Sequence, residues 1–126
     1  MPIATKMEIL SSAPRVWSIL TDTQLWSVWG PSVTRVESTT RFITADSRGR
    51  VRTAVGLWLP FEITGFDDGR FWTWRVAGMR ATGHRVEALG DDRCRLSFEV
   101  PAAIAPYLVV CGIACRRIRA LANTRC

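Results

Sequence analysis

Apolar and polar residues alternate along much of this chain, which is the pattern of strands with one buried face. The alternating runs are rich in Val, Thr, Phe and Trp and are separated by turns that contain Gly and Asp. Tight turns of this kind join antiparallel neighbours, because a parallel connection needs about a dozen residues or more. The pattern predicts an antiparallel sheet with strands at about 5–10, 33–43, 50–56, 58–66, 70–77, 80–89 and 93–100.

Two short helices are predicted between the first and second strands. The first begins at Ser11 to Pro14, because a serine side chain can accept hydrogen bonds from the free backbone N–H groups and proline fits the first turn. The second is capped by Asp22 or Thr23 and ends at Gly30-Pro31, which cannot continue a helix.

After Pro101 the apolar spacing changes to three and four residues, which predicts a helix from Ala102 onward. About twenty helical residues extend roughly 30 Å, which is enough to cross a sheet diagonally. The predicted apolar face consists of Ile104, Leu108, Cys111, Cys115, Ile118 and Ala122, broadened by Tyr107, Ala114 and Leu121.

Composition indicates one domain with an unusual interior. The chain has 126 residues, 48% of them hydrophobic, and we expect a single domain over residues 1–126. Six of the residues are tryptophan. Each indole buries roughly 150–250 Å², and filling one small core with them without leaving a gap is difficult. We therefore expect an aromatic cavity, while a core filled solid by tryptophan remains the alternative.

The net charge of +6 raises the question of an anionic partner, and sixteen of the seventeen basic residues are arginine. These arginines are scattered at alternating strand positions without a dense run, which is typical of a solvated outer face. We expect no nucleic-acid partner, although the segment Arg70 to Arg75 (RFWTWR) could stack bases between arginines.

Other classes of function find little support in the sequence. Residues 1–10 do not form a secretory signal, and Ala102 to Cys115 is too short for a membrane span, so we expect a cytoplasmic protein. The cysteines at 94, 111, 115 and 126 are expected to be reduced thiols. Cys111 and Cys115 lack the further ligands of a metal site, and no phosphate-binding loop or nucleophile elbow is present. We therefore expect no metal and no cofactor.

A short motif with this order of elements resembles a known superfamily. Its residues are Ile9, Ala13 to Trp17, Leu20, Asp22 and Trp26 to Val33. They resemble the START-like superfamily, also called SRPBCC or Bet v 1-like, and in particular its polyketide cyclase/dehydrase and lipid-transport branch. The resemblance implies an α+β helix-grip fold, in which a seven-stranded curved antiparallel sheet wraps around a long C-terminal helix and two short helices follow the first strand. It also implies a cavity for lipids, polyketides or similar apolar molecules.

The alternation within each strand assigns side chains to the inner face, and hence to the expected cavity. His84, the only histidine, points inward and is the best candidate for a catalytic group, with a structural, hydrogen-bonded histidine as the alternative. Each inner residue can also be ordinary core. The candidate ligand-binding residues are Trp29, Phe61, Ile63, Trp72, Trp74, His84, Val86, Phe98, Tyr107, Leu108, Cys111 and Cys115.

Two functions are compatible with this pattern. The first is the binding of a hydrophobic small molecule between the sheet and the C-terminal helix. The alternative is a cyclase or dehydratase that uses general acid/base chemistry on a ligand held in the same cavity. The exposed strand edges also allow a homodimer.

Overall fold

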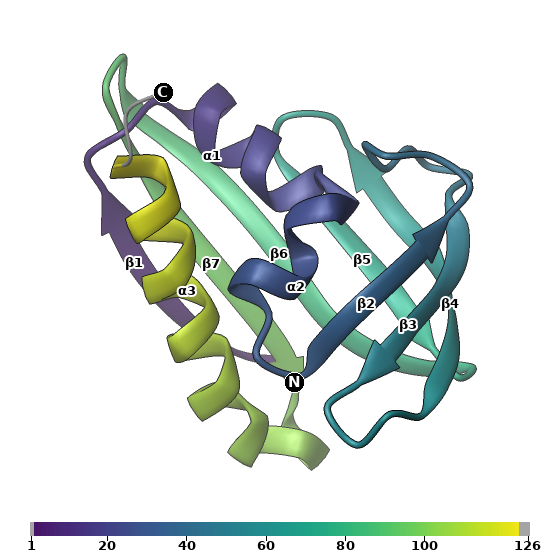
Figure 1. The fold of residues 1–126 in the computed structure, drawn as a ribbon. Helices are drawn as coiled ribbons and strands as arrows, with labels where there is room; N and C mark the ends of the chain where they lie inside the picture. The colour runs from purple at the N-terminus through teal and green to yellow at the C-terminus, as the bar shows by residue number, and fades with distance from the viewer. Residues whose placement is uncertain (1, 124–126) are drawn as a thin grey trace.

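The chain folds as a seven-stranded antiparallel sheet that curves around its helices (Figure 1). The computed structural model describes residues 2–123. The strand order is β1-β7-β6-β5-β4-β3-β2, so the first strand pairs with the last and the others follow a meander. This arrangement confirms the predicted helix-grip fold. The strands are β1 (Pro2–Ile9), β2 (Val33–Ser38), β3 (Arg48–Thr53), β4 (Trp58–Asp67), β5 (Phe71–Val76), β6 (Met79–Gly90) and β7 (Arg93–Pro101).

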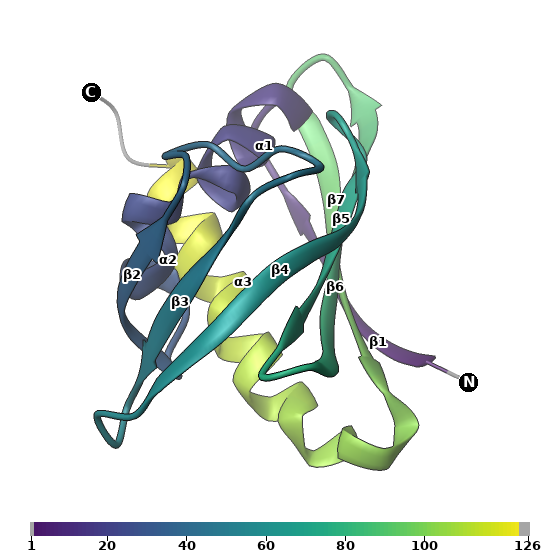
Figure 2. The same ribbon diagram turned by 90° about the vertical axis from the view of Figure 1, so that its right-hand side faces the viewer.

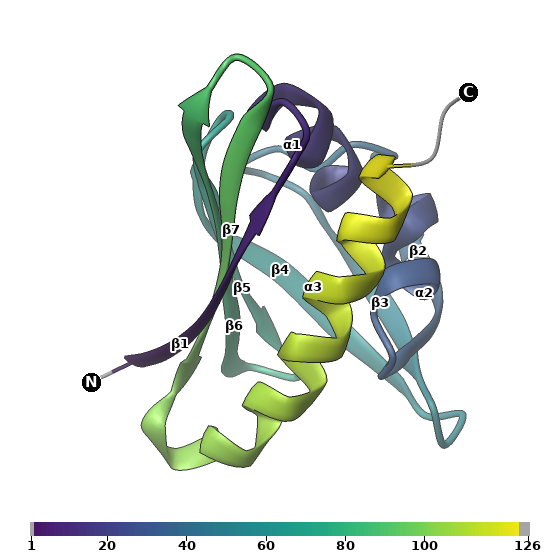
Figure 3. The same ribbon diagram turned by 90° about the vertical axis from the view of Figure 1, so that its left-hand side faces the viewer.

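All helices lie on the concave face of the sheet (Figure 2). The last helix runs diagonally across β1 and β7 and also contacts the two short helices (Figure 3). The helical segments are α1 (Ala13–Thr21), the 3-10 turn η1 (Thr23–Leu25), α2 (Trp26–Trp29), the 3-10 segment η2 (Ala102–Tyr107) and α3 (Leu108–Asn123).

The starts of the first two helical segments confirm the predicted caps. The Ser12 hydroxyl accepts a hydrogen bond from the Arg15 backbone N–H at 3.3 Å, and proline occupies the first turn of α1. The Asp22 carboxylate accepts from the Gln24 backbone N–H at 3.0 Å and so caps η1.

The outer, convex face of the sheet carries most of the strand arginines, as the alternation predicts. Four of these arginines pair with glutamates on neighbouring strands, and most of the paired side chains are half or more exposed. Exposed pairs of this kind contribute little to stability because water screens them. The pairs are Arg50–Glu37, Arg75–Glu62, Arg85–Glu99 and Arg95–Glu87.

Strand β2 ends at Ser38 and not at residue 43, because the following segment turns away from the sheet toward α1 and η1. The Arg41 guanidinium donates two hydrogen bonds to the Asp22 carboxylate, at 3.1 and 3.0 Å. The Thr23 backbone N–H donates to the Arg41 carbonyl at 2.8 Å, and the Ile43 N–H donates to the Thr21 carbonyl at 3.1 Å. These contacts compete with sheet pairing, and no alternation pattern reveals them.

The C-terminal helix becomes a regular α-helix at Leu108, six residues later than the apolar spacing predicts. Residues 102–107 form a 3-10 segment in which Ile104 has non-helical angles (φ −117°, ψ 35°). Pro106 lies in this segment and has no N–H to donate to the preceding turn. Ile104 is therefore exposed at the end of the molecule and does not join the buried face of α3.

Three further expectations concern membrane-spanning helices, metal ligands and the state of the cysteines. Within residues 2–123, no helix has both the length and the apolar character that a membrane crossing requires. In the same range, no three His, Cys, Asp or Glu side chains gather where they could hold a metal ion. Cys94, Cys111 and Cys115 are buried free thiols, and Cys126 lies outside the described residues.

Candidate functional site

A small hollow of about 40 Å³ lies between the sheet and α3. That volume accommodates a water molecule or the tip of a larger molecule. The structure brings seven of the predicted ligand-binding residues to its wall, from α2, β5, β6, β7, η2 and α3. These seven are Trp29, Trp72, Trp74, His84, Phe98, Tyr107 and Cys111.

Indole rings fill most of the interior in which the sequence predicts an aromatic cavity. Trp26 is 1% exposed and stacks on Trp72 with ring centroids 5.2 Å apart. It also meets Trp74 edge-on at 5.2 Å and Phe61 at 5.4 Å. Four aromatic side chains therefore occupy the centre of the core, and the inner hollow is the remainder.

An open apolar groove of about 390 Å³ adjoins this hollow. Both spaces share Ser32, Val33, Trp74, Thr82 and Tyr107, so the hollow forms the inner end of the groove. The groove opens between the β3–β4 hairpin, the β5–β6 turn and η2. Its other apolar lining residues are Val51, Ala54, Val55, Leu59, Val76, Met79, Ala81 and Ile104.

A chain of hydrogen bonds links the polar groups at the inner end. The His84 Nδ1 lies 3.3 Å from the Trp72 carbonyl oxygen, which can only accept, so Nδ1 carries the ring proton and donates. The unprotonated Nε2 then accepts from the Thr82 hydroxyl at 2.8 Å. The Thr82 oxygen in turn accepts from the Trp74 Nε1–H at 3.0 Å. Both ring nitrogens of His84 are thus engaged within the protein.

Burial keeps the His84 imidazole neutral. Loss of solvation lowers the pKa of His84 from 6.5 to about 3, and the hydrogen bond to the Trp72 carbonyl opposes this only in part. The ring also stacks on Trp72 with centroids 3.7 Å apart and planes 22° apart. A neutral imidazole with so low a pKa and no free nitrogen is suited to fixing Trp72, Trp74 and Thr82 in place.

One donor at the inner end is unsatisfied. The Nε1–H of Trp72 is buried and has no acceptor among the described residues. Leaving a buried donor unpaired costs about 1–3 kcal/mol, so such a group calls for an explanation. Trp72 is one of the residues that line the hollow, and its Nε1 atom itself is fully covered by the surrounding core.

The hydroxyl of Tyr107 lies 2.6 Å from the Ser32 hydroxyl, where η2 meets the loop after α2. Burial raises the pKa of Tyr107, although the Ser32 hydrogen bond partly offsets the effect. The phenol therefore stays protonated at neutral pH and can donate. Burial also raises the pKa of Cys111 to about 11 and of Cys115 to about 12, so these thiols are not nucleophiles.

Replacing Thr82 by valine is expected to destabilise the protein by about 1–3 kcal/mol, because the change keeps the shape and leaves His84 Nε2 and Trp74 Nε1 without their partner. Thr82→Ser should retain most of the stability, since it keeps the hydroxyl. Chemical unfolding of the two variants checks this, with Thr73→Val on the outer face as the control. Equal stability of the valine and serine variants would contradict the proposed hydrogen-bond chain.

Five of the predicted site residues lie away from both spaces. Ile63, Val86, Leu108 and Cys115 line neither the hollow nor the groove, and Phe61 packs its ring against Trp26 and Trp74. Strand alternation correctly places side chains on the inner face but does not distinguish residues beside a space from residues packed around it.

Several lining residues were not among the sequence candidates. Thr82 lies two residues before His84 in β6 and therefore shares its inner face, and this spacing was the one sequence signal for Thr82. Val55 and Met79 lie in or next to turns, where no periodicity marks an inward position. In the segment RFWTWR, Trp72 is fully buried and Trp74 is half-buried, and both residues line the hollow on the inner side of the sheet.

Comparison with known families gives a match over most of the chain. A family model described as "Polyketide cyclase / dehydrase and lipid transport" matches residues 3–120. No curated protein matches the chain in sequence at a significant level.

Several solved structures share the fold at low sequence identity. The protein XoxI from Bacillus cereus is 14% identical with a TM-score of 0.75, and the match covers 96% of this chain and 94% of that one. A START superfamily protein from Mycobacterium smegmatis is 13% identical with a TM-score of 0.72, covering 96% of each chain. Norcoclaurine synthase from Thalictrum flavum, in complex with dopamine and hydroxybenzaldehyde, is 11% identical with a TM-score of 0.64, covering 96% and 85%.

Proposed function

The chain belongs to the polyketide cyclase/dehydrase and lipid transport family, and we propose that it binds an apolar small molecule in the groove between the sheet and η2, the segment that leads into the C-terminal helix. The observation that carries the proposal is the groove itself, with a volume of about 390 Å³ and a mainly aliphatic lining. Ligand pockets in proteins commonly have volumes of about 300–1,000 Å³ and linings of this kind. The inner hollow is too small to take more than one end of such a ligand.

The polar groups at the inner end favour a ligand with one hydrogen-bond acceptor. The Tyr107 and Ser32 hydroxyls lie at the boundary between hollow and groove and can hold a carbonyl or hydroxyl oxygen of the ligand. The unpaired Trp72 Nε1–H is a further donor in the core beside the hollow. The proposed ligand is therefore an aliphatic or polyketide-like body with an oxygen at its leading end.

A cyclase or dehydratase activity has weaker support from the same geometry. Such chemistry needs a group that takes up a proton near neutral pH, and His84 has a pKa of about 3 with both nitrogens engaged. Norcoclaurine synthase shares the fold at 11% identity, which does not carry its reaction to this chain. Binding without conversion is the function we favour.

Titration with a neutral naphthylamine fluorophore tests the proposal. The wild-type protein should take up the probe saturably with one molecule per chain. Val33→Trp should weaken uptake by about tenfold or more, because Val33 lines both spaces and an indole there fills the passage between them. Thr64→Trp is the matched control, since it adds the same indole to the exposed outer face of β4.

Both variants must first be compared for stability by thermal unfolding. Saturable uptake that is equal in the wild type and in Val33→Trp would place the probe elsewhere and refute the proposed site. Absence of any saturable uptake by the wild type would refute binding of this class of ligand.

A further inference from the structure

Exposed apolar side chains gather at one end of the molecule. Val55 and Leu57 lie on the β3–β4 hairpin and are 88% and 58% exposed, and Met79 follows the β5–β6 turn at 70%. Ile104 in η2 and Val109 in the first turn of α3 are 39% and 70% exposed. These are five of the eight large exposed apolar residues in the described range, and we call the surface they form the open end.

The strand directions bring these segments together. In an antiparallel meander the β3–β4 and β5–β6 connections fall at the same end of the sheet, and η2 follows β7 at that end as well (Figure 1). Val55, Met79 and Ile104 also line the same groove. The open end is therefore the mouth of the groove.

Charge is distributed unequally between this end and the opposite one. The segments at the open end contain Arg35, Arg52 and Arg80 and no acidic residue. Within residues 2–123 none of the three forms a salt bridge, whereas four arginines farther along the strands pair with glutamates. The segments at the open end are 30–36, 51–60, 76–83 and 100–112.

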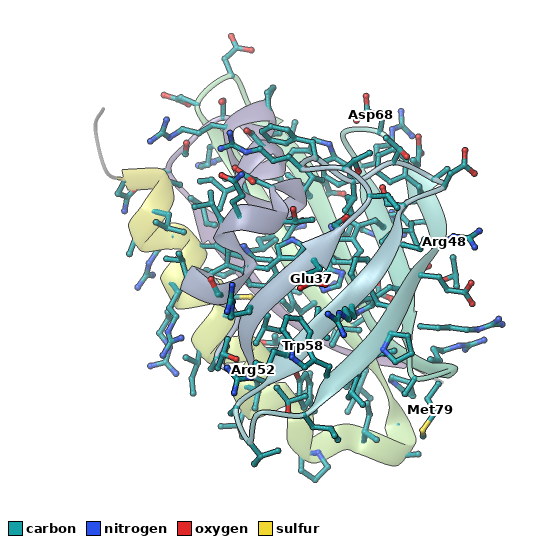
Figure 4. All side chains as sticks on the ribbon, turned by 45° about the vertical axis from the view of Figure 1, so that its right-hand side comes forward. Glu37, Arg48, Arg52, Trp58, Asp68 and Met79 are labelled. Atoms are coloured by element: carbon teal, nitrogen blue, oxygen red, sulfur yellow. The ribbon has the colours of Figure 1, made fainter. Side chains whose placement is uncertain are left out.

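The opposite end carries charges of both signs. Its turns, before β3, between β4 and β5 and between β6 and β7, carry exposed aspartates next to the exposed Arg41, Arg48, Arg70 and Arg93. Figure 4 shows Asp68 and Met79 at opposite ends of the molecule. The arginines of the open end have no acidic residue in the same segments to neutralise them, which favours contact with a negatively charged surface. The aspartates are Asp46, Asp67, Asp68, Asp91 and Asp92.

We propose that the open end docks on the surface of an anionic phospholipid membrane. Apolar side chains at the tips of the hairpin, turn and helix enter the boundary between headgroups and acyl chains, while the arginines lie near lipid phosphates. Each arginine close to such a surface strengthens binding roughly fivefold. The mouth of the groove then faces the lipid, so a ligand passes between membrane and groove without crossing water; this last step rests on the proposed function.

Cosedimentation with vesicles tests the docking. Wild-type protein should bind vesicles of phosphatidylcholine and phosphatidylglycerol, bind pure phosphatidylcholine vesicles far more weakly, and dissociate as salt rises. Leu57→Ser/Val109→Ser should weaken binding by about tenfold, and Arg35→Gln/Arg52→Gln by roughly 25-fold. None of these four residues lines the groove. Leu10→Ser/Val28→Ser, which removes exposed apolar side chains elsewhere, is the control and should bind normally.

Each result decides between docking and its competitors. No binding to anionic vesicles, or equal binding by all variants, overturns the docking proposal. A dimer in light scattering that Leu57→Ser/Val109→Ser converts to a monomer would instead assign the open end to self-association and overturn it as well. Fluorophore uptake in solution, measured on the same variants without vesicles, should be unchanged. If the wild type took up no fluorophore, the proposed ligand site would be refuted, while vesicle binding would still decide the docking proposal.

Discussion

Acidification from pH 6.5 toward pH 3 is expected to remove about 4–5 kcal/mol of stability through His84 alone. The unfolded chain binds a proton on this imidazole below pH 6.5, while burial lowers the pKa in the folded protein to about 3. Between these values the unfolded state holds more protons, so the free energy of unfolding falls as the pH falls. Each pKa unit corresponds to about 1.4 kcal/mol, and the His84 contribution is present in full above pH 6.5.

Urea unfolding at pH 7, 5 and 4 measures the effect against a variant that cannot titrate. His84→Gln keeps an amide that can hydrogen-bond with Thr82 and the Trp72 carbonyl, so it is expected to fold. The wild type should lose about 2 kcal/mol more than this variant between pH 7 and 5. Carboxylates titrate in both proteins and cancel in the comparison. Parallel pH profiles would show that His84 is not buried as a neutral group.

Replacing Trp26 by alanine is expected to destabilise the protein by about 3–5 kcal/mol and to enlarge the inner hollow. Trp26 is 1% exposed, donates a hydrogen bond to the Leu20 carbonyl at 3.0 Å and stacks on Trp72. Its removal leaves an apolar space next to the existing hollow, and spaces of this kind bind small aromatic molecules. Added indole should therefore restore part of the lost stability.

Thermal unfolding with and without indole measures both parts of this expectation. Trp58→Ala is the matched control, because Trp58 lies on the outer face with the Arg50 guanidinium 4.4 Å above its ring. That change should cost about 1 kcal/mol or less and should not respond to indole. If Trp26→Ala does not fold, Trp26→Phe provides a milder version of the same test. An indole response equal in the Trp26 and Trp58 variants would count against a new interior space.

The fold could be predicted because its signals are local and repeated. Leu96, Phe98 and Val100 alternate with polar residues over a whole strand, and each is buried as the alternation predicts. Asp22 and Ser12 cap helical segments through contacts with residues two or three positions away. Such signals depend on the period of the backbone and not on how distant elements pack.

The site could be predicted only in part because a cavity depends on packing over the whole core. Strand parity places Trp72, Trp74 and His84 on the inner face, yet it says nothing about the space left between rings. Trp26 fills most of that space by packing against Trp72 and Trp74. These contacts join residues far apart in sequence, so strand alternation does not reveal them. Val55 and Met79 reach the groove from turns, whose direction follows from the curvature of the sheet.

The pairing of β1 with β7 governs when the sheet can be completed during synthesis. Pro2 lies opposite Pro101 and Ile9 opposite Cys94, so the first strand has no partner until the ribosome has released the residues of the seventh. Until then both β1 and β6 present an unpaired backbone edge, which is the kind of surface that joins other chains. A nascent chain that stalls before residue 93 therefore exposes the edge of β6 and a wholly unpaired β1 in addition to the permanent edge at β2. Synthesis of β7 covers the edge of β6 and gives β1 its partner.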